Sequence, residues 1–229
     1  MLVVVTLHRL VTMRMRKHIM IKKGLVIGFL SLIFLGIAFL FWRNEWIYNL
    51  PTPVPEKYQP VNTGATIDLP ASLQLSSTLQ SSSAFSPARK PLFLHFFNPD
   101  CPCSRFNMTY FKTLVNQYGS RVDFAIVVLN NEDYTAKRVQ DKYGLGIPVF
   151  FDSSIAVRCG VYSTPQAVIL DADRKLYYRG NYNRSRYCTD PKSNYAQQAL
   201  DGLLQKKIDL HFDRFALTAY GCRLPNCKK

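Results

Sequence analysis

The stretch FLHFFNPDCPCSR, residues 93–105, decides the fold of this chain. An apolar run that reads as a buried strand leads into a short turn with two cysteines, Cys101 and Cys103, and a helix-compatible segment follows. The first turn of a helix presents unpaired N–H groups and a partial positive charge, and both favour a thiolate over a thiol. The segment therefore indicates two thiols placed for reversible disulfide chemistry.

Downstream of this elbow, apolar strands alternate with helices, and a hairpin and a last helix follow. The expected strands are 92–97, 122–129, 149–151, 167–170 and 176–178, and the expected helices are 104–118, 134–143 and 194–206. This order predicts an α/β fold, a three-layer α/β/α sandwich with a mixed sheet, over residues 91–210.

The N-terminal part reads as a membrane anchor. Residues 25–42 carry no charge, which is about the minimum length for crossing a bilayer, and basic residues precede them. No small-residue cleavage site closes the apolar run, so an uncleaved transmembrane helix is favoured over a signal peptide. Residues 1–24 are then a basic cytoplasmic N-terminus. Residues 43–90 read as a Pro/Ser-rich stalk and linker with one short helix over 71–79, and residues 211–229 as a cysteine-containing tail.

Charge and cysteine usage restrict the function classes. The formal net charge is +14, but the sequence contains neither a nucleic-acid-binding motif nor a long basic run, so no nucleic-acid partner is expected. All six cysteines follow the apolar stretch. In a bacterial inner-membrane protein of this topology they would face the oxidising periplasm, where disulfides form.

Two motifs carry a resemblance to a known family. The elbow FFNPDCPC, residues 96–103, resembles the active-site strand and turn of the thioredoxin fold, and residues 149–171 are similar to the second half of TlpA-like and AhpC/TSA-type redoxins. A little-characterised bacterial group of anchored thioredoxin-like proteins shares the Cys-Pro-Cys elbow. The resemblance implies a thioredoxin-like fold and a membrane-anchored thiol–disulfide oxidoreductase without a bound cofactor. Its partners would be protein thiols and disulfides in the periplasm and an unidentified redox partner.

The resemblance implies a role for each cysteine of the elbow. Cys101 would be the exposed nucleophile, and Cys103 would resolve the mixed disulfide. The family's usual second cysteine falls at Ser104, so this pair is one residue closer. A Cys-x-Cys disulfide closes a smaller ring, which predicts strain and a more oxidising or isomerase-like couple.

Two further site residues are implied by position. Thr164-Pro165 resembles the family's cis-proline dipeptide, which lies beside the active disulfide and offers its backbone to substrate. His95 lies six residues before Cys101, where many thioredoxins carry a buried acid, and it would shuttle the proton of the resolving cysteine near neutral pH. The alternative is a core histidine that is bonded to a backbone carbonyl.

The other cysteines allow several pairings. Cys222 and Cys227 would form a structural loop or a second disulfide that relays electrons, or they would bind a metal or stay unpaired. Cys159 and Cys188 would pair with each other or stay as buried thiols.

Two other functions fit parts of the pattern. Cys101 and Cys103 could hold Cu(I) in a metallochaperone of thioredoxin fold, with His95 or His211 as a further ligand. A thiol peroxidase is the other alternative, although Asn98 stands where that family has a threonine or serine. A domain that keeps the fold as a scaffold for an envelope complex is a third.

Overall fold

The computed structural model describes all residues except 1, 72, 74–88, 130–133, 208–209 and 225–229. The chain divides into two compact units, Met1–Asn49 and Leu50–Lys229. Each is described by itself.

The first unit is helical. Helix α1 spans Leu2–Asn44 and a 3-10 helix, η1, spans Trp46–Asn49. Within α1, the stretch His18–Asn44 is long and apolar enough, by length and composition, to cross a membrane, and all its side chains are exposed. It contains the apolar residues 25–42 that the sequence marks as an anchor.

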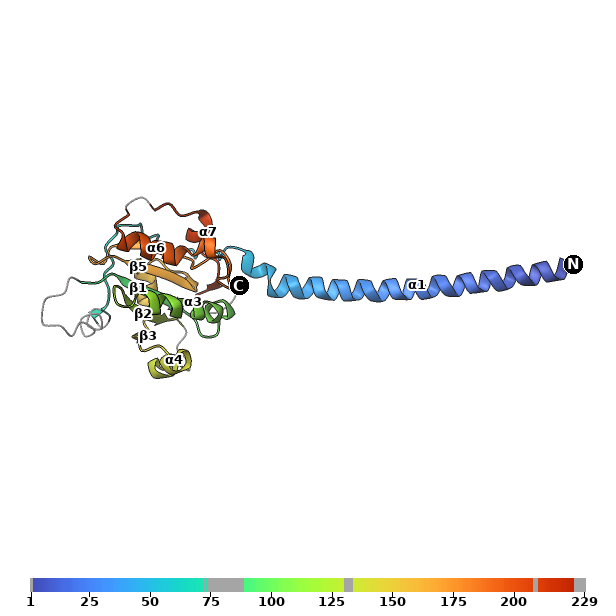
Figure 1. The fold of residues 1–229 in the computed structure, drawn as a ribbon, viewed down its shortest axis with the longest axis horizontal. Coiled ribbons are helices and arrows are strands. Elements are labelled where there is room, and N and C mark those ends of the chain that lie inside the picture. Colours follow the sequence, from blue (N-terminus) through green and yellow to red (C-terminus); the bar gives the residue numbers. More distant parts are fainter. Residues whose placement is uncertain (1, 72, 74–88, 130–133, 208–209, 225–229) are drawn as a thin grey trace. The chain divides into compact units, whose positions relative to one another are not determined.

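The second unit is built on a five-stranded mixed sheet in the order β3-β2-β1-β5-β6 (Figure 1). The strands are β1 (Leu92–Phe97), β2 (Asp123–Val128), β3 (Val149–Phe150), β5 (Gln166–Leu170) and β6 (Leu176–Gly180). Strands β1, β2 and β3 are parallel, whereas β5 runs antiparallel to β1 and β6 antiparallel to β5. This is the mixed sheet that the sequence predicts.

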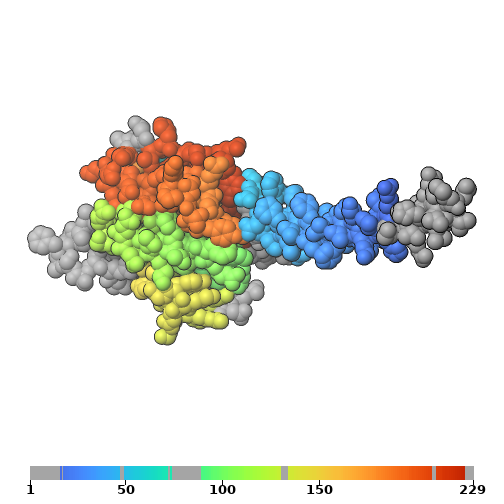
Figure 2. All heavy atoms as spheres, turned by 45° about the vertical axis from the view of Figure 1, so that its right-hand side comes forward, coloured from blue at the N-terminus to red at the C-terminus, as the bar shows by residue number. Residues whose placement is uncertain are grey.

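Helices and a second, two-stranded sheet complete this unit. The helices are α3 (Pro102–Tyr118), α4 (Ala136–Tyr143), α5 (Ser154–Arg158), the 3-10 helix η2 (Pro191–Ser193), α6 (Tyr195–Leu204) and α7 (Arg214–Leu217). In the second sheet, β4 (Ser163–Thr164) pairs antiparallel with β7 (Cys222–Arg223). Residues of α3 and α4, green to yellow, and of the chain after β6, orange to red, form one face of this unit (Figure 2).

Alternate residues of β1 point to opposite faces of the sheet and enter two cores. Phe93 and Phe97 pack with side chains of α3 and α6, among them Phe111 and Leu200. The other face has a separate core, which takes Leu94 and Phe96 from β1 and further residues from α5 and from the chain before β1. Helix, sheet and helix layers therefore form the three-layer sandwich expected from the sequence, with a thioredoxin-like topology.

The expected linker differs from the structure. Ile67, Leu69 and Leu73 are buried in the second core, and Thr66 forms a β-bridge with Lys175. Apolar side chains at alternate positions can cover a sheet face, so this part of residues 43–90 packs on the domain instead of extending as a stalk. The helix expected over 71–79 lies largely outside the described residues.

The expected tail also packs on the domain. Ala216, Ala219 and Cys222 are buried, and Asn181 donates hydrogen bonds of 2.6 Å to the carbonyls of Phe215 and Thr218. The compact unit therefore begins before residue 91 and continues beyond residue 210.

Candidate redox-active site

The elbow after β1 is held by short-range hydrogen bonds. Asn98 Oδ1 accepts a bond of 2.9 Å from the backbone N–H of Asp100, and the Cys101 N–H donates to the Asn98 carbonyl at 3.1 Å. The Asn98 N–H in turn donates to the buried Ser104 hydroxyl at 3.3 Å. Pro102 fills the first helical position, where its missing N–H costs nothing. These contacts fix Cys101 as the N-cap residue of α3.

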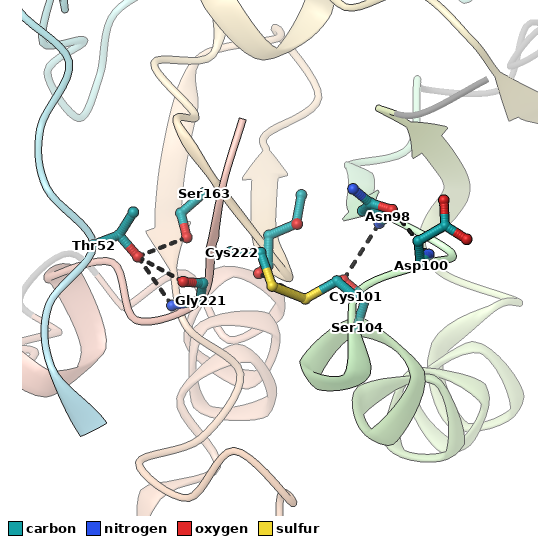
Figure 3. Close-up of a disulfide and its surroundings, with 9 residues drawn as sticks. Thr52, Asn98, Asp100, Cys101, Ser104, Ser163, Gly221 and Cys222 are labelled. Carbon is teal, nitrogen blue, oxygen red and sulfur yellow. Dashed lines mark hydrogen bonds between the residues drawn. A yellow bond between two sulfur atoms is a disulfide. The ribbon is translucent and has the colours of Figure 1, made fainter. Parts of the chain in front are cut away.

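The sulfur of Cys101 forms a disulfide with Cys222 of β7, which is 121 residues away in the sequence (Figure 3). The two Cα atoms are 6.5 Å apart, within the range of native disulfides. Cys101, which was expected to be exposed, is fully buried in this disulfide, and Cys222 is 2% exposed. Cys103, in the first turn of α3, is a thiol and is 3% exposed.

This pairing differs from the expected ones, which join Cys101 with Cys103 and Cys222 with Cys227. The backbone pairing of β4 with β7 sets Cys222 opposite Thr164, and this register brings its sulfur to the elbow. Local sequence contains no signal for such a long-range register. Cys227 itself lies outside the described residues.

The Thr164-Pro165 peptide bond is cis, as expected, whereas its role towards a substrate stays a prediction. The Cys101 sulfur lies 4.0 Å from the Thr164 carbonyl oxygen, and Thr164 is fully buried. The end of β4, directly before the cis-proline, therefore lies beside the disulfide.

A buried threonine that sequence reasoning missed holds β7 in place. The Thr52 hydroxyl is 3.0 Å from the Ser163 hydroxyl, donates to the Gly221 carbonyl at 3.0 Å and accepts from the Gly221 N–H at 3.0 Å (Figure 3). The Thr52 N–H also donates to the Ala219 carbonyl at 2.8 Å. Gly221 leaves no space for a side chain, because a Cβ there would meet the Thr164 carbonyl. In the sequence, the glycine directly before Cys222 is the one hint that the backbone is closely packed at this point.

His95 is a core residue of β1. Its Nδ1 lies 2.6 Å from the Tyr182 hydroxyl, and its ring stacks on Phe111 with centroids 4.3 Å apart. Complete burial lowers the pKa of His95 to about 3, so the imidazole is neutral at neutral pH. The structure thus disagrees with a proton shuttle that titrates near neutral pH. It agrees with a core histidine, although the hydrogen-bond partner of the ring is the Tyr182 hydroxyl and not a backbone carbonyl.

Cys159 and Cys188 do not pair with each other. Cys159 is buried in the second core, whereas Cys188 packs against the first and accepts a hydrogen bond of 3.1 Å from Asn107 Nδ2. Burial raises the pKa of each thiol to about 12, so both stay protonated at neutral pH. Protonated thiols are poor nucleophiles, and neither is a candidate for the exchange reaction.

Within the described part of the chain, no three or more His, Cys, Asp or Glu side chains gather in a group that could hold a metal ion. The expected Cu(I) ligands His95 and His211 therefore form no such group with Cys101 and Cys103.

The mixed sheet, the cysteine elbow after β1 and the cis-proline before β5 together define a protein of thioredoxin-like fold. A family model described as "Domain of unknown function (DUF6436)" matches residues 71–226, and the chain belongs to this family. No curated protein matches the sequence.

Solved structures from several bacteria are similar to this chain. A hypothetical protein of Sinorhizobium meliloti is 19% identical, with 73% of this chain and 96% of that chain covered and a TM-score of 0.56. An uncharacterised conserved protein of Geobacillus kaustophilus is 20% identical, with 71% and 93% covered and a TM-score of 0.52. A secreted disulfide oxidoreductase of Mycobacterium tuberculosis, homologous to DsbE, is 21% identical over 51% of this chain and 81% of that one, with a TM-score of 0.38.

Proposed function

We propose that this protein is a membrane-anchored thiol–disulfide oxidoreductase that exchanges disulfides with cysteines of other proteins through Cys101. The observation that carries the proposal is the disulfide of Cys101 at the N-terminus of α3, with a second thiol, Cys103, two residues further on and the cis-proline loop 4.0 Å away.

The position of Cys101 favours its reactive form. When the disulfide is reduced, the sulfur lies at the positive end of the dipole of α3, a 17-residue helix. The unpaired N–H groups of the first turn are positioned to stabilise a thiolate there.

The exchange then proceeds in two balanced steps. The Cys101 thiolate attacks one sulfur of a partner's disulfide, which forms a mixed disulfide and releases the other partner sulfur as a thiolate. Cys103 loses its proton and attacks the Cys101 sulfur, so that a Cys101–Cys103 disulfide forms and the partner leaves with two thiols. The partner gains two electrons and this protein loses two. The reverse sequence oxidises a partner's dithiol.

The N-terminal helix supports a site of action in the periplasm. The apolar residues 25–42 would anchor the chain in a bacterial inner membrane, and the basic residues before them favour an N-terminus in the cytoplasm. The second unit would then lie in the periplasm, where protein thiols and disulfides are the substrates.

Reduction of insulin disulfides by glutathione, catalysed by the full chain in detergent micelles, tests the proposal. Cys101→Ser should abolish the catalysed rate, because it removes the attacking sulfur. Cys188→Ser is the matched control and should keep the wild-type rate, because this thiol is protonated and hydrogen-bonded away from the elbow. A Cys101→Ser protein that is as active as the wild type would refute the assignment.

A further inference from the structure

We propose that β7 is an internal substrate strand: Cys222 occupies Cys101 in a closed form of the protein, and Cys103 opens this form by disulfide exchange. The inference rests on the proposed function and adds a third redox cysteine to it.

The backbone pairing of β7 with β4 resembles the pairing expected for a bound partner segment. Cys222 lies opposite Thr164, the residue before the cis-proline, and Arg223 lies opposite Ser163. Main-chain hydrogen bonds at a strand edge do not depend on side-chain identity, so an edge that accepts β7 can accept an extended segment of another protein. In the closed form, a cysteine of this chain takes the place on β4 that a partner's cysteine would need.

The burial of the disulfide shows that the closed form excludes external thiols from Cys101. Both sulfur-bearing residues of the disulfide are buried, Cys101 completely and Cys222 to all but 2%. An external thiolate must approach a disulfide along the S–S axis, and the burial of both residues leaves no such approach open. Release of β7 is therefore needed before a partner reaches Cys101.

The attachment of β7 is small. It forms a ladder of two residue pairs with β4 and belongs to a sheet separate from the five-stranded one. Among the described residues, further support comes from the buried hydroxyl of Thr52, which bridges Ser163 and Gly221. Leu224, directly after β7, packs against the second core, and its N–H lies 3.4 Å from the Tyr162 carbonyl oxygen. Because β7 pairs with no strand of the main sheet, it can leave while the five-stranded sheet stays folded.

The opening step conserves electrons. Cys103 loses a proton and its thiolate attacks the Cys101 sulfur; the Cys101–Cys103 bond forms, the Cys101–Cys222 bond breaks, and the Cys222 thiolate leaves and takes up a proton. Closed and open forms are isomers with one disulfide each. The open form exposes β4 and the Cys101–Cys103 disulfide to a partner's thiol.

Disulfide mapping of the full chain in detergent tests the closed form. After oxidation with glutathione disulfide and blocking of thiols, trypsin places the four cysteines in question in three of its peptides. These are residues 90–105 with Cys101 and Cys103, residues 215–223 with Cys222, and residues 224–228 with Cys227. We expect a link between the first and second peptides in the wild type and in Cys227→Ser. A link between the second and third peptides, or none to the first, would overturn the proposal.

The rate of opening separates an exchanging disulfide from a purely structural one. With glutathione at about 0.1 mM, the link to residues 215–223 should disappear about tenfold more slowly in Cys103→Ser than in the wild type, since an intramolecular thiol acts at an effective concentration of about 1 mM or more. Equal rates would show that Cys103 does not open the closed form.

Thr52 is proposed as a positioning residue, and two variants test it in the Cys103→Ser background. Thr52→Val removes the hydroxyl and should speed the loss of the link by about fivefold for each net hydrogen bond lost, whereas Thr52→Ser keeps the hydroxyl and the slow rate. Equal rates for both variants would overturn this role.

Failure of the inference is distinguishable from failure of the proposed function. If only the inference fails, the wild type and Cys222→Ser catalyse insulin reduction equally and no link to residues 215–223 forms. If the function fails, neither protein catalyses it, whatever the mapping shows.

Discussion

Replacing His95 and Tyr182 together by phenylalanine should make the second unit less sensitive to acid. The two side chains form one buried hydrogen bond of 2.6 Å, and removing both partners leaves no unsatisfied polar group behind. In the wild type, burial lowers the pKa of His95 from 6.5 to about 3. Between these values the unfolded chain binds a proton that the folded protein does not bind.

The sign and size of the effect follow from this difference. The stabilisation by neutral His95 is fully present above pH 6.5 and is lost as the pH falls towards 3. With these two pKa values, the free energy of unfolding drops by about 2 kcal/mol between pH 8 and pH 5 through this one group. That is a large part of a typical stability of about 5–15 kcal/mol.

Urea unfolding of the full chain in detergent at pH 8, 6 and 5 measures this loss. Both tryptophans, Trp42 and Trp46, lie in the first unit, so the near-ultraviolet circular dichroism of the tyrosines is the better probe of the second unit. The double variant keeps the carboxylates whose pKa values are shifted, such as Asp123, Asp152 and Asp190, and thus cancels their contribution.

If wild type and variant lose the same free energy between pH 8 and pH 5, His95 does not titrate as argued. The rate of disulfide exchange gives a second readout. A core role predicts the same pH profile for both proteins, whereas a shifted inflection would restore the proton-shuttle hypothesis.

Two more predictions concern stability. Reduction of the Cys101–Cys222 disulfide should lower the free energy of unfolding by about 2–5 kcal/mol, because it releases a loop that spans 121 residues of sequence. Urea unfolding of the oxidised and the reduced protein measures this difference. A similar difference between oxidised and reduced Cys222→Ser would contradict the assignment of the disulfide. Phe111→Ala should lower the free energy of unfolding by about 3–5 kcal/mol, because this fully buried ring packs against His95, Phe93 and Phe124. A loss below about 1 kcal/mol in the same assay would contradict this and show that the core closes around the cavity.

Local sequence determines the framework of this protein. The signals for the strand, the elbow and the helix lie within a few residues of one another: the apolar run of β1, the Asn98 turn and Pro102 at the start of α3. Residues 93–105 alone therefore predict these three elements. The alternation of strands and helices gives the three-layer sandwich, and the Thr164-Pro165 dipeptide marks the loop beside the elbow.

Only the tertiary structure decides which residues meet at the sulfur. Cys222 reaches Cys101 from 121 positions away, and Thr52 reaches Ser163 from 111 positions away. Such contacts depend on strand register and packing between segments without a shared local pattern, so six cysteines in a sequence leave their pairing open. The same holds for Ile67, whose burial is set by a sheet face that forms far along the chain.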